Sequence, residues 1–233
     1  MVRVNQLVAG YGRKIVLDGI SFDVSDGEVV GVLGSNGSGK STLIRSFFHI
    51  AKVFFGTITL DDQDILKMTH TNRSRLISVQ RLSRIEGVHL TVKDYVALGI
   101  QNPDDSRLKT ILEEFDLTKL INKPISELSD GEIQRATLAQ AVIKKPRLYL
   151  LDEPTAHLDL KYKIQMLEDI VTHIKDGSSA IAVIHDLGLA KYYCDKVVLI
   201  KDGKIFETGK PTLLDDKLLV AKLYGLESTF SFL

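Results

Sequence analysis

Short apolar runs of strand length recur along the chain and are separated by segments with helical spacing. Three of these runs, Glu28–Leu33, Arg147–Leu151 and Ala180–Ile184, are rich in aliphatic or β-branched residues and contain few polar positions. Such runs predict buried strands, because about 4–8 residues suffice for a strand whereas a helix needs more. A fourth run, Leu76–Val79, follows the same pattern.

Helix and turn patterns occupy much of the rest. The segments with helical spacing, capping residues or a terminating Gly or Pro are Thr91–Gly99, Asp104–Phe115, Ala136–Ile143 and Thr212–Tyr224. Val197–Ile200 and Ile205–Thr208 flank Asp202-Gly203, which predicts a β-hairpin. Met1–Val8 is expected to form a further strand. The alternation of strands and helices predicts an α/β fold.

The segment after the first buried strand fits the pattern G-x-x-x-x-G-K-[ST] at every fixed position. Its glycines allow the backbone to curl, so that N–H groups and the positive end of the next helix converge on phosphates. Lys40 is expected to reach the β- and γ-phosphates, and Ser41 to give an oxygen to Mg²⁺. The predicted nucleotide-binding residues are Gly34, Ser35, Asn36, Gly37, Ser38, Gly39, Lys40, Ser41 and Thr42. The motif does not separate ATPases from GTPases or small kinases.

Two carboxylates end the strand Arg147–Leu151. Charge at the end of a buried strand is costly unless it has a partner, and Asp152 is a candidate to hold Mg²⁺. Glu153 is placed to accept a proton from, or to orient, the water that attacks the γ-phosphate. Taken alone, such a pair is usually a solvated strand end. Together with the phosphate loop, it indicates a hydrolytic site.

Composition narrows the class of protein. The chain has 233 residues, of which 44% are hydrophobic and 26% charged, as expected for a globular chain with a substantial core. Lys plus Arg and Asp plus Glu both total 30, so no basic field argues for nucleic acid as a partner. Cys194 is the single cysteine, which excludes an internal disulfide. No run approaches the roughly 18 apolar residues that span a bilayer, so a membrane role requires a partner.

The segment Leu128–Arg135 resembles the signature of the ABC ATPases, whose usual form is L-S-G-G-Q; here the sequence is L-S-D-G-E. It lies about twenty residues before Asp152, at the start of a predicted helix. In the family, this segment faces the γ-phosphate bound by a second subunit. The resemblance therefore implies that Ser129 and Gly131 bind ATP across a head-to-tail dimer. Without it, Ser129–Glu132 would be interpreted as a helix cap.

Four further landmarks of that family follow in the family's order along nearly the whole chain. Tyr11, between Gly10 and Gly12 in an expected turn, matches the aromatic residue that stacks on adenine. Gln80 matches the glutamine that contacts Mg²⁺ or the attacking water, and His185 matches the switch histidine that bonds the γ-phosphate. Asp159 matches a residue that links the two sites across the dimer, although Thr155–Asp159 could also simply cap a helix.

The resemblance implies a P-loop core of ABC type with an antiparallel β subdomain and an inserted helical subdomain. Residues 1–80 and 146–233 would form the nucleotide-binding lobe and residues 81–145 the helical lobe, within one ABC ATPase domain. The implied cofactors are ATP and Mg²⁺. The chain would act as a homodimer or pseudo-symmetric dimer on an integral membrane permease, peripheral to the cytoplasmic face of the cell membrane.

Within the family, His185–Ala190, Cys194–Val198 and the Asp130 and Glu132 variant of the signature resemble importer ATPase subunits. These subunits serve the uptake of iron-siderophores, haem and cobalamin, and they imply a substrate-binding protein as a further partner. An exporter subunit would share every motif. A soluble ATPase resembling the iron-sulfur assembly proteins, which also carry Glu in the signature, would bind no permease.

Overall fold

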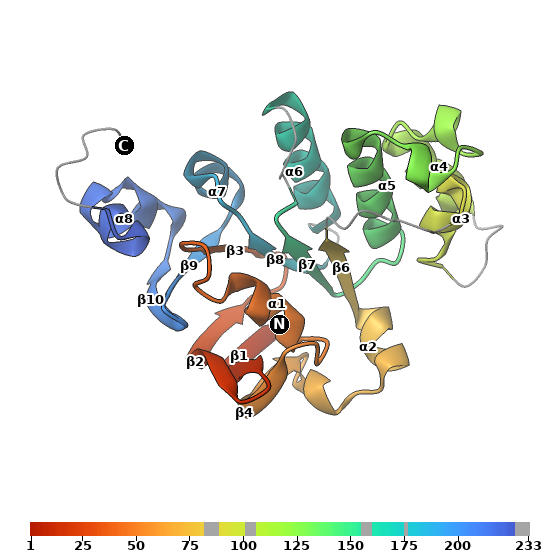
Figure 1. The fold of residues 1–233 in the computed structure, drawn as a ribbon. Coiled ribbons are helices and arrows are strands. Elements are labelled where there is room, and N and C mark those ends of the chain that lie inside the picture. The colour runs from red at the N-terminus through yellow and green to blue at the C-terminus, as the bar shows by residue number, and fades with distance from the viewer. Residues whose placement is uncertain (82–88, 101–105, 155–159, 175–176, 227–233) are drawn as a thin grey trace.

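The computed structural model describes residues 1–81, 89–100, 106–154, 160–174 and 177–226 (Figure 1). The strands are β1 Val2–Tyr11, β2 Lys14–Val24, β3 Val29–Leu33, β4 Lys52–Leu60, β5 Gln63–Asp64, β6 Ile77–Arg81, β7 Leu148–Asp152, β8 Ser179–Val183, β9 Lys196–Lys201 and β10 Lys204–Gly209. The α-helices are α1 Lys40–Ser46, α2 His70–Leu76, α3 Val92–Ala97, α4 Ser106–Glu114, α5 Asp130–Val142, α6 Leu160–Ile174, α7 Leu187–Tyr193 and α8 Lys217–Tyr224. The 3₁₀ turns are Ile65–Lys67, Thr118–Leu120, Ile125–Glu127 and Pro211–Asp215.

A six-stranded sheet in the order β10-β9-β3-β8-β7-β6 forms the centre of the molecule (Figure 1). Strands β9, β3, β8, β7 and β6 are parallel, and β10 is antiparallel to β9, as the predicted hairpin requires. The register sets Asp152 opposite Val183 on one side and Arg81 on the other, and Val183 opposite Val32. The carboxyl ends of these strands therefore share one edge of the sheet.

A second sheet, in the order β2-β1-β4-β5, is antiparallel throughout and is built mainly from the first 64 residues. It packs on the large sheet with α1 between them, since Leu43 and Ile44 of that helix and its C-cap Phe47 join one buried cluster with residues of both sheets. The predicted antiparallel group near the start and the predicted mixed sheet are thus both present.

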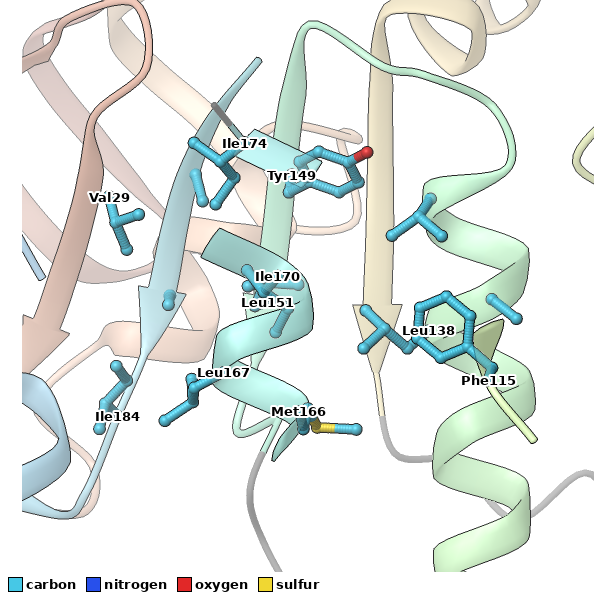
Figure 2. Close-up of a cluster of buried hydrophobic side chains, with 14 of the residues drawn as sticks. Val29, Phe115, Leu138, Tyr149, Leu151, Met166, Leu167, Ile170, Ile174 and Ile184 are labelled. Atoms are coloured by element: carbon cyan, nitrogen blue, oxygen red, sulfur yellow. The ribbon is translucent and has the colours of Figure 1, made fainter. Parts of the chain in front are cut away.

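Successive residues of the central strands serve opposite faces of the large sheet. Val30, Leu150 and Ile181 belong to the cluster shared with the antiparallel sheet, whereas Tyr149 and Leu151 belong to a second cluster under α3 to α8. Figure 2 shows this second cluster, in which Met166, Leu167, Ile170 and Ile174 of α6 pack over Tyr149 and Leu151 of β7. Both faces are covered, which explains why these strands have continuous apolar runs instead of alternating ones.

Helices α3, α4 and α5 lie together beyond the β6 edge of the sheet (Figure 1). They come from the chain between β6 and β7, where the helical insertion was expected. The start of α3 follows the prediction, because Thr91 is its N-cap and accepts from the backbone N–H of Asp94. Asp104 and Asp105 of the predicted second helix lie outside the described residues, and α4 covers Ser106–Glu114.

Several predicted elements have different boundaries in the structure, and two of these differences separate one element from the next. Leu76 ends α2 and is not the first residue of a strand. The segment Thr212–Tyr224 is not one helix, because a 3₁₀ turn ends at Asp215 and α8 begins at Lys217. The carboxylate of Asp216 accepts from the backbone N–H groups of Leu218 and Leu219, so Asp216 is the N-cap of α8 and separates it from the 3₁₀ turn.

Candidate functional site

The loop between β3 and α1 depends on glycine at two positions. A Cβ atom at Gly34, whose φ is +152°, would lie 2.1 Å from the carbonyl oxygen of Ile200. One at Gly39, whose φ is +112°, would lie 2.5 Å from Cδ2 of Leu17. The loop is also held from the β9–β10 turn, since Gly203 N donates to the Ser38 carbonyl at 3.1 Å. Close packing on both sides therefore fixes the curled path that the motif predicts.

Lys40, the first residue of α1, turns back over the loop. Its Nζ donates to the carbonyl oxygens of Gly34 at 2.8 Å and Ser35 at 2.9 Å, and the side chain is buried. Burial lowers the pKa of Lys40, while the charges of Glu153 and Asp152 act in the opposite direction. The ammonium group is thus set among the loop carbonyls with two carboxylates nearby.

Ser41 and Asp152 meet at the carboxyl edge of the sheet. The Ser41 hydroxyl donates to Oδ1 of Asp152 at 3.3 Å, although the two residues are 111 positions apart. Asp152 is the last residue of β7 and is only 8% exposed. The parallel register brings them together, because β3 and β7 both flank β8 and end at the same edge. A hydroxyl and a carboxylate oxygen side by side are ligands that a hard cation prefers.

Glu153 and His185 form a second contact at the same edge. Nε2 of His185 donates to Oε1 of Glu153 at 2.7 Å, and both side chains are more than 40% exposed. Glu153 has a φ of +57°, which is uncommon for a residue with a side chain and costs conformational energy. The backbone thus turns at the residue directly after Asp152, the last residue of β7.

Gln80 lies on β6 opposite Leu151, one residue before the level of Asp152. Its side chain is buried, yet neither its Oε1 nor its Nε2 has a hydrogen-bond partner among the described residues. The Oγ of Ser38 in the loop is also buried without a described partner. A buried amide without a partner is costly, so both groups are suited to a polar ligand at this edge.

Tyr11 is the last residue of β1, paired with Lys14, and not part of the turn itself as the sequence suggested. The turn follows at Gly12, whose φ is +58°. Tyr11 is 38% exposed, and its hydroxyl accepts a hydrogen bond from Nη1 of Arg45 at 3.0 Å. Sequence reasoning did not single out Arg45. Its place four residues after Ser41, one turn along α1, is the pattern that could have drawn attention to it.

The signature segment begins α5 with a complete capping box. Oε2 of Glu132 accepts from the backbone N–H of Ser129 at 2.8 Å and from its hydroxyl at 2.9 Å, and the Glu132 N–H donates to Ser129 Oγ at 3.4 Å. These hydrogen bonds, chiefly the one from the Ser129 backbone, lower the pKa of Glu132. Ser129 is exposed and Gly131 half-buried. The structure therefore leaves the Ser129 hydroxyl with its own helix and does not bring it to the phosphate loop.

One contact joins this helix to the strand end with the carboxylates. Nε2 of Gln134, which is buried, donates to the carbonyl oxygen of Pro154, directly after Glu153. Nothing in the sequence pattern distinguishes Gln134 from other helical glutamines, so this link was missed. Asp159, predicted to lie at the dimer interface, is outside the described residues.

Over the described ranges, no group of three or more His, Cys, Asp or Glu side chains is arranged to hold a metal ion. Within the same residues, no helix is both long and apolar enough to cross a membrane. Cys194 is buried, which raises the pKa of its thiol to about 12.

Comparison with known proteins gives a consistent result. The family model for ABC transporters matches residues 17–156. A hemin import ATP-binding protein of Shewanella denitrificans is 33% identical, with 99% of this chain and 95% of that protein aligned. A petrobactin import ATP-binding protein of Bacillus anthracis is 30% identical, over 99% of this chain and 88% of that protein. A solved structure, of an ATP-binding subunit of an ABC transporter, superposes with a TM-score of 0.82 at 27% identity, covering 98% of this chain and 95% of the other.

Proposed function

This chain belongs to the ABC transporter family as one of its ATPase subunits, and we propose that it powers the import of a metal chelate through a separate membrane permease. The cargo class is an iron-siderophore, haem or cobalamin-type chelate. The names of its relatives, which import hemin and petrobactin, support this class.

The convergence of the phosphate loop with Asp152, Glu153 and His185 at one sheet edge is the observation that carries the catalytic part of the proposal. We assign ATP phosphates to the loop Gly34–Thr42, where backbone N–H groups, the start of α1 and the Lys40 ammonium supply positive potential. The Lys40 ammonium, which donates to two loop carbonyls in this structure, is assigned to the β- and γ-phosphates. Tyr11 is assigned to the adenine ring.

Hydrolysis is assigned to the exposed pair at the end of β7. Glu153 accepts a proton from, or orients, the water that attacks the γ-phosphate, and His185 hydrogen-bonds both Glu153 and that phosphate. The contact between Glu153 and His185 supports this assignment, because it lets one residue fix the orientation of the other. The charge of Glu153 acts on the Lys40 ammonium, which supports a place for its carboxylate near the loop.

The oxygen atoms at this edge fit a magnesium ion. Ser41 and Asp152 offer adjacent oxygens, and Gln80 offers a buried amide oxygen without a described partner. We therefore assign Mg²⁺ to Ser41, Asp152 and Gln80 together with the nucleotide. Bound there, the ion would neutralise charge on the β- and γ-phosphates.

The second nucleotide contact is assigned to a partner subunit. The described chain has one phosphate loop and one signature, and Ser129 faces outward at the exposed start of α5. We propose a homodimer or pseudo-symmetric dimer, arranged head to tail, in which Ser129 and Gly131 of each subunit meet the γ-phosphate on the other. Asp159 would connect the two sites.

The proposal divides the chain into a nucleotide-binding lobe, 1–80 and 146–233, and a helical lobe, 81–145. The grouping of α3, α4 and α5 beyond β6 supports this division (Figure 1). The subunit would lie on the cytoplasmic face of the cell membrane, bound to an integral permease that receives cargo from a substrate-binding protein. Nucleic acid is not a proposed partner.

Co-purification tests the assignment of partners. Glu153→Gln protein, recovered from native membranes with Mg·ATP, is expected to bring down a polytopic permease, and a substrate-binding protein would favour import over export. Lys40→Ala protein prepared in parallel is the matched control for association that depends on nucleotide. Recovery of soluble partners alone from the cytosolic fraction would replace transport by an assembly function.

Sedimentation tests the dimer independently. The Glu153→Gln variant with saturating Mg·ATP is expected to sediment as a dimer and with ADP as a monomer. If the protein remained a monomer with ATP at high protein concentration, the head-to-tail dimer would be wrong, whereas the ATPase assignment would stand.

A further inference from the structure

Helix α1 carries a second contact that the phosphate site does not use. Its first residues, Lys40 and Ser41, are at the loop, and Arg45 is in its last turn. There Nη1 of Arg45 donates to the hydroxyl oxygen of Tyr11 at 3.0 Å, joining the helix to the end of β1 across 34 positions of sequence. One short helix thus touches both the phosphate loop and the proposed partner of the adenine ring.

Arg45 is well fixed for this contact. Its carbonyl oxygen accepts from the backbone N–H groups of Phe48, Ile50 and Ala51, which close the last turn of α1. Its Nε is buried and has no described partner, so the guanidinium is packed with one end inward and the other directed at Tyr11. The hydrogen bond to Tyr11 is the main reason why the pKa of Arg45 is raised.

Tyr11, in contrast, ends β1, where it pairs with Lys14 and glycines flank it on both sides. A Cβ added at Gly12 would meet nothing within 4 Å, so the turn directly after Tyr11 lies in open space. Tyr11 is partly exposed, at 38%. A tyrosine without side-chain neighbours in sequence loses rotamer freedom when it stacks on a ligand, unless another contact has already restricted it. The hydrogen bond from Arg45 is such a contact.

We propose that Arg45 is a positioning residue, which holds the Tyr11 ring ready for the nucleobase and so links base recognition to the phosphate site through α1. This inference rests on the proposed role of Tyr11 in binding adenine. It separates two contributions to affinity. Ligands that carry a base depend on Arg45, whereas ligands made only of phosphate do not.

The test compares Mg·ADP with Mg·pyrophosphate by isothermal titration calorimetry, because neither ligand is hydrolysed at this site and they differ by the nucleoside. Arg45→Met keeps the aliphatic stem and removes the donor; Tyr11→Phe keeps the ring and removes the acceptor. Each is expected to weaken ADP binding about two- to tenfold, the range for one hydrogen bond, with pyrophosphate affinity unchanged. The double variant should be no weaker than either single variant, because both remove the same interaction.

Tyr11→Ala identifies which assumption fails. It should weaken ADP binding more than Tyr11→Phe does, since the stacking ring is lost. If Tyr11→Ala weakens ADP binding and Arg45→Met does not, the role of Arg45 is wrong and that of Tyr11 stands. If Tyr11→Ala has no effect, the assignment of Tyr11 fails, and the inference with it. Equal weakening of ADP and pyrophosphate by Arg45→Met would show that Arg45 supports the helix or the phosphates, which also overturns the proposal.

Discussion

The N-termini of α1 and α5 are both assigned to phosphate, yet they differ in how much of their surroundings the chain itself provides. At the start of α1, Lys40 is buried against loop carbonyls and Ser41 contacts Asp152. At the start of α5, Ser129 is exposed and its hydroxyl bonds Glu132 three residues on. The sheet brings together the segments of the first site, which are the loop before α1 and the carboxyl ends of β6, β7 and β8. At the second site, the polar groups of Ser129 are hydrogen-bonded within α5 itself.

This difference indicates that the two helix starts act at different stages of nucleotide binding. Nucleotide affinity of the single chain should depend on the start of α1, because its charged and oxygen-bearing groups are already in place. The start of α5 should matter only when a second subunit approaches. Variants at the two helix starts therefore ought to give different results in monomer and dimer measurements. Three of the following changes lie at these helix starts, and Glu153→Gln separates binding from turnover.

Lys40→Ala should have the largest effect on nucleotide binding. It removes the ammonium that lies over the loop, and with it the charge-assisted contact to the β-phosphate, so Mg·ADP affinity should fall about 10- to 100-fold. Calorimetric titration measures this loss. Lys109→Ala, at a side chain 83% exposed on α4, is the control and should bind normally. Near-normal binding by Lys40→Ala would contradict the expectation that nucleotide affinity depends on the start of α1.

Glu153→Gln should retain binding and lose turnover. Replacement of the carboxylate removes the proton acceptor but keeps the size of the side chain, so the hydrolysis rate should fall about 10²- to 10⁴-fold. Phosphate release and ADP titration on the same protein separate the two effects. Glu113→Gln, on the exposed surface of α4, serves as the matched control. Rapid hydrolysis by Glu153→Gln would remove Glu153 from the catalytic role.

Ser129→Ala should act on the dimer alone. In the Glu153→Gln background it should weaken ATP-driven dimerisation about tenfold, because a hydrogen bond to phosphate is lost in each composite site. ADP affinity of the monomer should not change. Ser126→Ala, in the exposed 3₁₀ turn before α5, is the control. Since Ser129 also caps α5, a thermal melt of each variant must accompany sedimentation. If Ser129→Ala weakened ADP binding by the monomer as much as it weakened dimerisation, Ser129 would not act through the dimer alone.

Glu132→Ala should have the smallest effect. It removes one half of the capping box and should cost about 0.5–1 kcal/mol of unfolding free energy at neutral pH. The pKa of Glu132 is lowered by folding, so the carboxylate stabilises the fold above its unfolded pKa. That contribution is lost as pH falls through the lowered value. The difference in unfolding free energy between Glu132→Ala and wild type should therefore be smaller in acid. Urea titrations at neutral pH and at acid pH measure it. If the difference in unfolding free energy did not change with pH, the loss in Glu132→Ala would come from side-chain packing and not from the carboxylate charge.

Sequence sufficed for the features set by local chemistry. Continuous apolar runs gave β3, β7 and β8, glycine spacing gave the phosphate loop, and the S-x-x-E pattern allowed the cap at Ser129. The meeting of Ser41 with Asp152 could be anticipated only because both follow strands that share an edge. It was the resemblance to ABC ATPases that singled out Gln80 and Tyr11, since neither residue carries its own pattern.

Other features depend on tertiary contacts. Asp216 divides the C-terminal segment because its carboxylate finds two N–H groups, a competition that helical spacing does not reveal. The bonds from Arg45 to Tyr11 and from Gln134 to Pro154 cross between distant elements, so no periodicity encodes them. The left-handed backbone of Glu153 is likewise not indicated by any pattern in the sequence.

The two hydrogen bonds from Lys40 to the carbonyls of Gly34 and Ser35 have a consequence for the kinetics of nucleotide capture. A glycine-rich loop has a large conformational entropy, and a ligand that had to order it would bind slowly and lose affinity. Here the chain restricts the loop during its own folding. An incoming triphosphate therefore meets an ordered loop in which only the Lys40 ammonium must exchange carbonyl oxygens for phosphate, and its association rate should reflect encounter instead of loop ordering.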